Sequence, residues 1–164
     1  MGRIEELTGH LATLAGSPQV VVACGRNEAL RRRLAGAWAR EPRVQVLGFT
    51  TEMPRFLHAA DLVVTKAGPS AVMETLAAGR PMILHGYLPG QERGNVTWLE
   101  QRGLALLRTD PAEAAALAAS WLAEGPEALA TRQANARAAA RPRAALDIAG
   151  RILDLVVDVA EDDG

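Results

Sequence analysis

Short apolar runs and helically spaced apolar residues alternate along most of this chain. Runs rich in branched aliphatic residues predict buried strands at residues 19–24, 44–47, 62–65, 82–84 and 104–107. Apolar residues at helical spacing predict helices at residues 4–14, 27–38, 53–59, 70–78 and 92–101. Strands that alternate with helices are typical of βαβ units. The pattern therefore predicts an α/β domain, a Rossmann-like doubly wound parallel sheet covered on both faces.

Glycine and proline mark the predicted boundaries. Gly79 and Pro81 end one helix, and Asp110 before Pro111 is a good N-cap for another. Everything after Pro111 has a helical pattern, with breaks near 125–126 and 141–142. No linker interrupts this order, so residues 1–160 are expected to form a single domain. The acidic residues 161–164 are expected to be a frayed tail.

The predicted order begins on a helix, whereas a doubly wound sheet usually begins with a strand. Met1 and Gly2 are typical of the end of a glycine-rich turn. We therefore expect that the first strand of the sheet is missing from this sequence and that the sequence is part of a longer protein.

Composition excludes several classes of protein. The 164 residues carry a formal net charge of −1, which offers no electrostatic basis for binding nucleic acid or an anionic membrane. Cys24 is the only cysteine, which excludes an internal disulfide and a cysteine-based zinc site. The sequence contains neither a signal-peptide pattern nor an apolar run near the ~20 residues of a spanning helix. We expect a cytoplasmic protein, peripheral to a membrane at most.

Polar and glycine residues follow four of the predicted strands. They are Gly25, Arg26 and Asn27, then Gly48, Phe49 and Thr50, then 66–70, and finally 87–92. The carboxyl ends of parallel strands meet at one edge of a sheet, where α/β proteins bind their ligands. The clustering predicts a nucleotide site at that edge.

The turn at 66–70 has the features of an anion site. Gly68 permits a close backbone approach, and Pro69 suits the first turn of a helix, where its missing N–H is no loss. The free N–H groups of Ser70 and Ala71 would then point at a diphosphate. The spacing is that of neither a P-loop nor a dinucleotide-binding turn. An ordinary strand-to-helix turn explains the same residues equally well.

Two further groups suit a sugar nucleotide. Glu74 follows Ser70 by one helical turn, where its carboxylate could accept hydrogen bonds from both ribose hydroxyls. Gln91, Glu92 and Asn95 lie within one turn and could bind sugar hydroxyls. A solvated glutamate and a polar loop remain the alternatives.

His85 ends a strand and could face the site, although a structural role suits it better. No residues in the sequence have the spacing of metal ligands.

Nearly all of the chain from Ile4 to about Val157 resembles a known family, most strongly from Cys24 to Gly103. The motifs T-K-A-G-P-S, the glutamate four residues later, G-x-P and P-G-Q-E-x-G-N carry the likeness. They resemble the carboxyl-terminal, donor-binding domain of family 28 glycosyltransferases, which have the GT-B fold. The monogalactosyldiacylglycerol synthase and diacylglycerol glucosyltransferase group is the most similar part of that family.

The resemblance implies a site for a UDP-sugar donor. The implied donor-binding residues are Gly25, Arg26, Asn27, Phe49, Thr50, Lys66, Gly68, Pro69, Ser70, Glu74, Gln91, Glu92 and Asn95. In this family the turn at 68–70 would hold the diphosphate and Glu74 the ribose. The backbone at 49–50 would hold the uracil, with 25–27 nearby. Residues 91–92 would read the sugar hydroxyls, with Asn95 beside the diphosphate.

The resemblance also implies what this chain lacks. An acceptor domain with the catalytic base would be needed in cis or in trans, so no catalytic residue is assigned here. The expected function is the donor half of an inverting hexosyltransferase acting on a lipid-type acceptor, with no cofactor or metal. Any membrane contact would come through the missing domain. The alternatives are a non-catalytic UDP-sugar-binding subunit and, with Glu92 and His85 as the only support, a UDP-sugar 2-epimerase.

Overall fold

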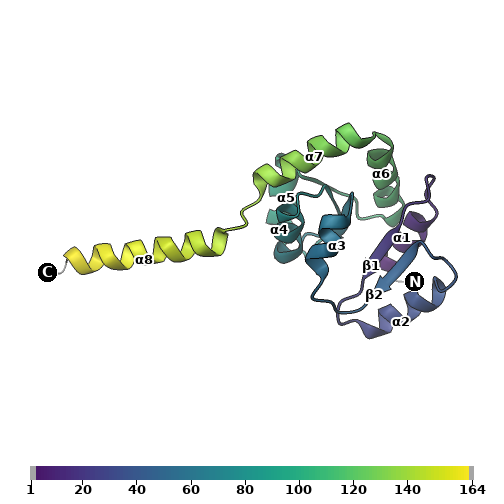
Figure 1. Cartoon of the computed structure of the whole chain (residues 1–164), viewed down its shortest axis with the longest axis horizontal. Coiled ribbons are helices and arrows are strands. Elements are labelled where there is room, and N and C mark those ends of the chain that lie inside the picture. The colour runs from purple at the N-terminus through teal and green to yellow at the C-terminus, as the bar shows by residue number, and fades with distance from the viewer. Residues whose placement is uncertain (1–2, 163–164) are drawn as a thin grey trace.

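The computed structural model describes residues 3–162, with side chains described up to residue 155. The strands are β1 (Val20–Ala23), β2 (Val44–Leu47), β3 (Val63–Lys66), β4 (Met82–Gly86) and β5 (Ala105–Leu107). The helices are α1 (Arg3–Ala12), α2 (Glu28–Ala37), α3 (Met53–Ala59), α4 (Pro69–Ala77), α5 (Arg93–Gln101), α6 (Pro111–Ala123), α7 (Pro126–Ala139) and α8 (Ala144–Asp162). The α/β, Rossmann-like class predicted from the sequence is confirmed (Figure 1).

All strand pairs in the described part of the chain are parallel, but they form two sheets. One sheet pairs β1 with β2, and the other has the order β3-β4-β5. The sequence predicts the strands correctly yet does not predict this division. An apolar run shows that a strand is buried. It does not show which strand lies beside it, because that depends on pairing between segments distant in the sequence.

The three-stranded sheet carries the larger core. Met82 and Leu84 of β4 face one side, where they pack with residues of α4, α5 and α7. Ile83 points to the opposite face, where it packs with α1 and α6. Successive side chains of a strand point to opposite faces, so Met82, Ile83 and Leu84 of β4 are fully buried between two layers of helices.

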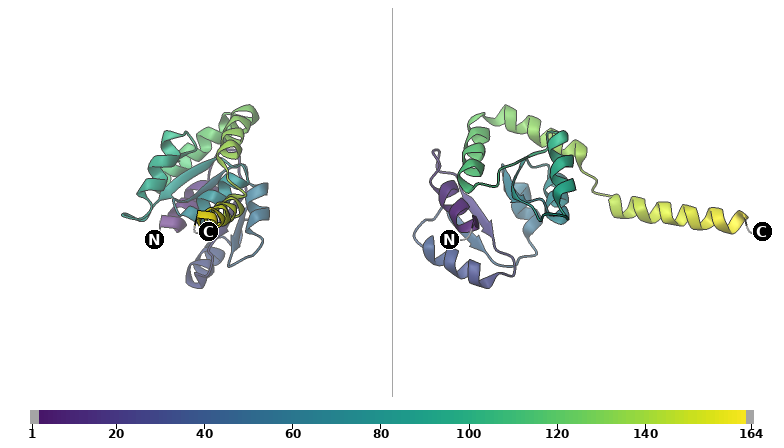
Figure 2. Two further views of the ribbon diagram at one scale, coloured as in Figure 1. Left: turned by 90° about the vertical axis from the view of Figure 1, so that its left-hand side faces the viewer. Right: turned by 180° about the vertical axis from the view of Figure 1, so that it is seen from behind.

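Helix α1 lies against both sheets. Its Leu7 packs beside Ile83 and α6, whereas Ala12 packs with Val20 and Val44 of the two-stranded sheet. Leu11 contacts both of these clusters. In the view from behind in Figure 2, α1 lies in front of β1 and β2. A single helix therefore joins the two sheets through side-chain packing.

The predicted helix ends are confirmed by capping bonds. The side chain of Asn27 accepts a hydrogen bond from the N–H of Leu30 at 3.0 Å. Asp110 accepts bonds from the N–H groups of Ala112 and Glu113, both at 3.0 Å. Gly79 follows α4 with a φ of +67°, which favours glycine at the end of a helix.

Helix α8 extends away from the rest of the molecule (Figure 1). Up to residue 155, its large apolar side chains are therefore solvent-exposed, including Leu146 at 65% and Ile152 at 56%. The helix continues through Asp162 and so includes the first two residues of the tail predicted to be frayed. Residues 163–164 lie outside the described part of the chain.

Candidate functional site at the carboxyl ends of the strands

The predicted anion turn lies between β3 and α4. Gly68 is the N-cap of α4, with φ −64° and ψ 135°, and Pro69 occupies the first turn. No side chain caps this helix end. The first intrahelical bond from this turn is donated by the N–H of Val72 to the carbonyl of Gly68 at 3.0 Å. The N–H groups of Ser70 and Ala71 thus remain available to an anion at the positive end of the helix dipole.

Glu92 and Asn95 lie beside this turn. The amide of Asn95 donates a hydrogen bond to the carbonyl of Ala67 at 2.8 Å, across 28 residues of sequence. A Cβ atom built on Gly68 would lie 3.4 Å from Oε1 of Glu92. The other carboxylate oxygen of Glu92 accepts a bond from the N–H of Leu88 at 2.7 Å, which closes the 87–92 loop. Three of the predicted site residues are therefore brought together.

The remaining predicted residues of this group are open to solvent. Ser70 and Glu74 are exposed on α4, one turn apart, as the sequence predicts. Gln91 is exposed in the loop before α5, and Lys66 is exposed at the end of β3. None of these side chains makes a hydrogen bond or ion pair in the described part of the chain, so each is free to meet a ligand.

A second group of predicted residues lies at the ends of β1 and β2. The guanidinium of Arg26 lies over the ring of Phe49, 4.6 Å from its centroid, and Phe49 is 63% exposed. Gly25 has a φ of +55°. Two side-chain oxygens of this group already have structural partners: Asn27 caps α2, and the hydroxyl of Thr50 accepts a bond from the N–H of Glu52 at 3.0 Å.

The two groups belong to different sheets. The group of Arg26 and Phe49 ends β1 and β2, whereas the group of Gly68, Glu92 and Asn95 ends β3 and β4. No hydrogen bond or ion pair joins the two groups among residues 3–162. The structure thus brings the predicted residues together as two clusters, each at the carboxyl ends of its own strands.

Arg3 is a neighbour of the site that the sequence did not single out. Its guanidinium donates a hydrogen bond to the carbonyl of Thr109, just beyond β5, at 2.8 Å. Helix α1 therefore begins at the carboxyl edge of the strands. The position of α1 directly before β1 could have indicated this, because a crossover helix runs antiparallel to the strand that follows it.

His85 of β4 is a half-buried base close to two cations. Burial lowers the pKa of His85, and the positive charges of Lys66 and Arg3 lower it further. The imidazole is therefore neutral at pH 7.

We expect the acid side of the stability curve to depend on His85. The unfolded chain takes up this proton near pH 6.5, before the folded protein does, so the stabilising effect is complete above that pH and is lost as the pH falls. The free energy of unfolding should fall more steeply between pH 7 and pH 5 in wild type than in His85→Gln. The difference stays below the one-proton limit of about 1.4 kcal/mol per pH unit, because solvent screens the partly exposed ring. Urea titrations at each pH measure the free energy of unfolding. Parallel pH profiles for wild type and His85→Gln would contradict the prediction.

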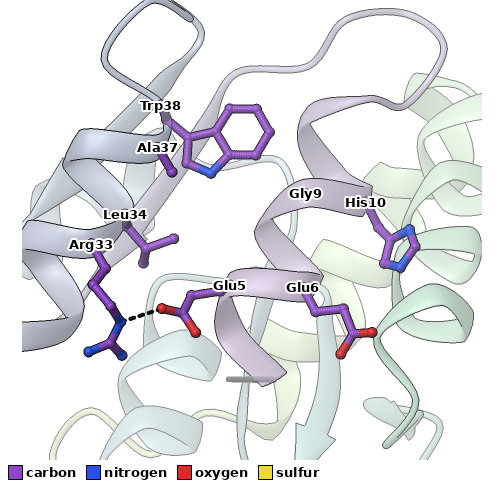
Figure 3. A pocket seen from close by; sticks show the side chains of 8 residues that line it. All are labelled: Glu5, Glu6, Gly9, His10, Arg33, Leu34, Ala37 and Trp38. Carbon is purple, nitrogen blue, oxygen red and sulfur yellow. Dashed lines mark hydrogen bonds and ion pairs between the residues drawn. The ribbon is translucent and has the colours of Figure 1, made fainter. Parts of the chain in front are cut away.

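A depression of about 770 Å³ lies elsewhere, between α1 and α2 (Figure 3). Trp38 and Leu34 of α2 form its apolar wall. Glu5 of α1 and Arg33 of α2 pair across it at 2.6 Å, which occupies both charges. It contains none of the predicted donor-binding residues, so the candidate site stays at the carboxyl ends of the strands.

Comparison with known families decides the classification of this fold and its motifs. The family model for the glycosyltransferase family 28 C-terminal domain matches residues 4–145. The chain belongs to glycosyltransferase family 28. The resemblance stated from the sequence, over residues 4 to about 157, is thereby confirmed over residues 4–145.

Curated relatives of this family 28 domain are considerably longer than the chain. Monogalactosyldiacylglycerol synthase 3, chloroplastic, of Arabidopsis thaliana is 39% identical over 130 residues, which cover 79% of this chain and 28% of that protein. A probable monogalactosyldiacylglycerol synthase of Glycine max is 38% identical over 145 residues, covering 86% of this chain and 27% of that protein. The matched region thus covers under a third of the length of these relatives.

A solved structure supports the fold of the family 28 domain. A crystal structure of the glycotransferase of kitacinnamycin matches with a TM-score of 0.61 over 92% of this chain and 39% of that chain. The two sequences are 23% identical, so this likeness concerns the fold alone. In the described part of the chain, no helix is long and apolar enough to cross a membrane. No cluster of three or more potential metal ligands occurs there either.

Proposed function

We propose that this domain binds the UDP-sugar donor of an inverting hexosyltransferase that acts on a lipid-type acceptor. The observation that carries the proposal is the uncapped amino end of α4, whose turn lies against Glu92 and Asn95. Its relatives at 36–39% identity are named monogalactosyldiacylglycerol synthases, which supports the choice of a glycolipid reaction.

The turn at Gly68 would hold the donor diphosphate. The N–H groups of Ser70 and Ala71 and the helix dipole offer positive partial charge without a metal ion. When the bond from the sugar to the diphosphate breaks, negative charge grows on the leaving group. Fixed dipoles aimed at that charge lower the barrier, because they need no reorganisation. The exposed Lys66 at the end of β3 adds a positive charge at the same edge.

The other residues would fix the nucleoside and the sugar. Glu74 would accept hydrogen bonds from the ribose hydroxyls, and Gln91 and Glu92 would contact sugar hydroxyls. The backbone at Phe49 and Thr50 would hold the uracil, next to Gly25 and Arg26. The acceptor, its site and the base that activates its hydroxyl would come from another domain, in cis or in trans, which would also make any peripheral membrane contact.

Gly68→Ala tests the role of the turn. The φ and ψ of Gly68 suit any residue, and the new Cβ would make an ordinary 3.4 Å contact with Glu92, so the fold should be kept. The methyl group would, however, stand where the diphosphate approaches the backbone. We expect at least a roughly tenfold weaker affinity for UDP by calorimetry, with an unchanged Tm.

Gly36→Ala in α2 is the matched control, because a Cβ there meets no atom within 4 Å. It should leave UDP binding unchanged. A folded wild-type domain that shows no binding of UDP, or a Gly68→Ala variant that binds as well as wild type, would overturn the assignment of this turn.

A further inference from the structure

The loop that follows β2 has a backbone without hydrogen bonds of its own. The N–H of Cys24 bonds to the carbonyl of Leu47 at 2.9 Å, at the carboxyl end of the β1–β2 ladder. In the part of the chain that the structure describes, no backbone group of residues 48–50 bonds to another backbone group. The N–H and C=O groups of Phe49 and Thr50 are therefore available to a ligand.

Arg31 of α2 supports this loop from one side. A Cβ atom built on Gly48 would lie 3.1 Å from Cδ of Arg31, so the aliphatic part of this side chain lies close against the backbone of Gly48. The same Cβ would lie 4.0 Å from the carbonyl oxygen of Gly25, at the end of β1. The absence of a side chain at Gly48 thus leaves the room that the Arg31 side chain fills.

Glu28 fixes the Arg31 side chain in this position. Nε of Arg31 donates to one carboxylate oxygen at 2.8 Å, and a terminal nitrogen donates to the other at 2.6 Å. Two such bonds fix the orientation of a guanidinium as well as its distance. Both residues lie at the start of α2, which is capped by Asn27 and buries Leu30 and Leu34 beside β1 and β2. Arg31 is therefore held on an anchored helix.

The Arg31–Glu28 pair does little for the stability of the whole fold. The two side chains are 38% and 55% exposed, and solvent screens pairs that are this exposed. The effect of the pair is local, because it keeps the Arg31 side chain against Gly48. A loop that is already ordered binds its ligand more tightly, since less freedom is lost on binding.

We propose that Arg31 is a positioning residue for the nucleobase. The Arg31–Glu28 pair holds the backbone of residues 48–50 in the conformation in which its N–H and C=O groups meet the edge of a pyrimidine. Arg31 acts through this backbone and does not contact the ligand. The inference rests on the proposed function, which assigns uracil to Phe49 and Thr50, and it adds the contact that orders this site before the donor binds.

Arg31→Met and Glu28→Ala test the proposal in calorimetry with UDP. Methionine keeps most of the aliphatic part but cannot pair with Glu28, and alanine at position 28 leaves Arg31 without its partner. We expect both variants to bind UDP about tenfold more weakly, with little change in Tm. The direction for Glu28→Ala separates two explanations. Removal of a negative charge would by itself strengthen the binding of an anion, whereas loss of the pair weakens it.

Matched variants separate positioning from charge. Arg32→Met removes the same charge from the next residue, which is exposed and makes no hydrogen bond or salt bridge in the described part of the chain, so UDP binding should not change. Glu113→Ala removes a glutamate from the first turn of α6 and should not change it either. UMP carries the same base with less charge, so Arg31→Met should weaken UMP and UDP by the same factor. A loss confined to UDP would overturn the proposal, because it would place the effect on the diphosphate.

The domain without ligand offers an independent measurement. In nitrogen-15 relaxation, the amide order parameters of Phe49 and Thr50 should fall in Arg31→Met from the rigid range, about 0.85, toward the flexible range below about 0.6. They should stay unchanged in Arg32→Met. Unchanged order parameters in Arg31→Met, or an unchanged affinity for UDP, would overturn the proposal.

The same titrations distinguish this inference from the proposed function. A folded wild-type domain that fails to bind UDP would overturn both. If wild type binds UDP and Gly68→Ala weakens that binding while Arg31→Met does not, the proposed function stands and the role of Arg31 is overturned.

Discussion

Replacing Glu74 with alanine is expected to weaken UDP binding at least about 100-fold. A carboxylate accepting both ribose hydroxyls makes two charge-assisted hydrogen bonds, each worth about 1.5–3 kcal/mol. The side chain is exposed in the middle of α4, and alanine favours helices, so the fold should not change. Calorimetry with UDP measures the loss, and circular dichroism verifies the fold.

Two comparisons make this result specific to Glu74. Glu113→Ala removes the same charge from another exposed helical position, on α6, and should leave binding unchanged. Glu74→Gln keeps one acceptor oxygen and should lie between wild type and Glu74→Ala. Equal UDP affinities for Glu74→Ala and wild type would show that Glu74 is only a solvated residue of α4, which is the alternative that its sequence context leaves open.

Leu99→Ala is expected to destabilise the domain by about 2–5 kcal/mol. Leu99 is fully buried on α5, in the cluster that also contains Leu76, Met82 and Leu84. Truncation removes apolar contacts and leaves a cavity that the surrounding strands and helices fill only in part. Urea unfolding measures the change as a lower midpoint with a similar slope.

The same truncation on α8 serves as the reference. Leu146 is 65% exposed, so Leu146→Ala should change the free energy of unfolding by less than about 0.5 kcal/mol. If Leu99→Ala were as mild as Leu146→Ala, the packing of α5 against the three-stranded sheet would be wrong. Since α5 carries Asn95 and follows Glu92, the position of these side chains would then be in doubt as well.

Local signals predicted the elements of this fold closely. The Met53–Ala59 helix was predicted with the bounds that the structure has, and Pro54 in its first turn marks where it begins. Breaks at Gly125-Pro126 and Arg141-Pro142 separated the last three helices. Such signals act within a few residues, so sequence alone reveals them.

Long-range contacts could not be predicted in the same way. The bond from Asn95 to the carbonyl of Ala67 and the stacking of Arg26 on Phe49 join segments separated by 28 and 23 residues, respectively. Their residue types suit many partners, and the fold selects one. The sequence likewise predicted a helix after Pro142 but not that α8 extends away from the domain. The roles of the donor-binding residues remain predictions.

The two-part sheet also determines how this domain can be observed as it unfolds. Trp38 packs with the β1–β2 sheet, whereas Trp98 and Trp121 belong to clusters around β3, β4 and β5. Each part thus carries its own tryptophan fluorophore, and the two parts share α1 but no hydrogen-bonded ladder. Fluorescence from single-tryptophan variants can therefore distinguish one cooperative transition from two separate ones.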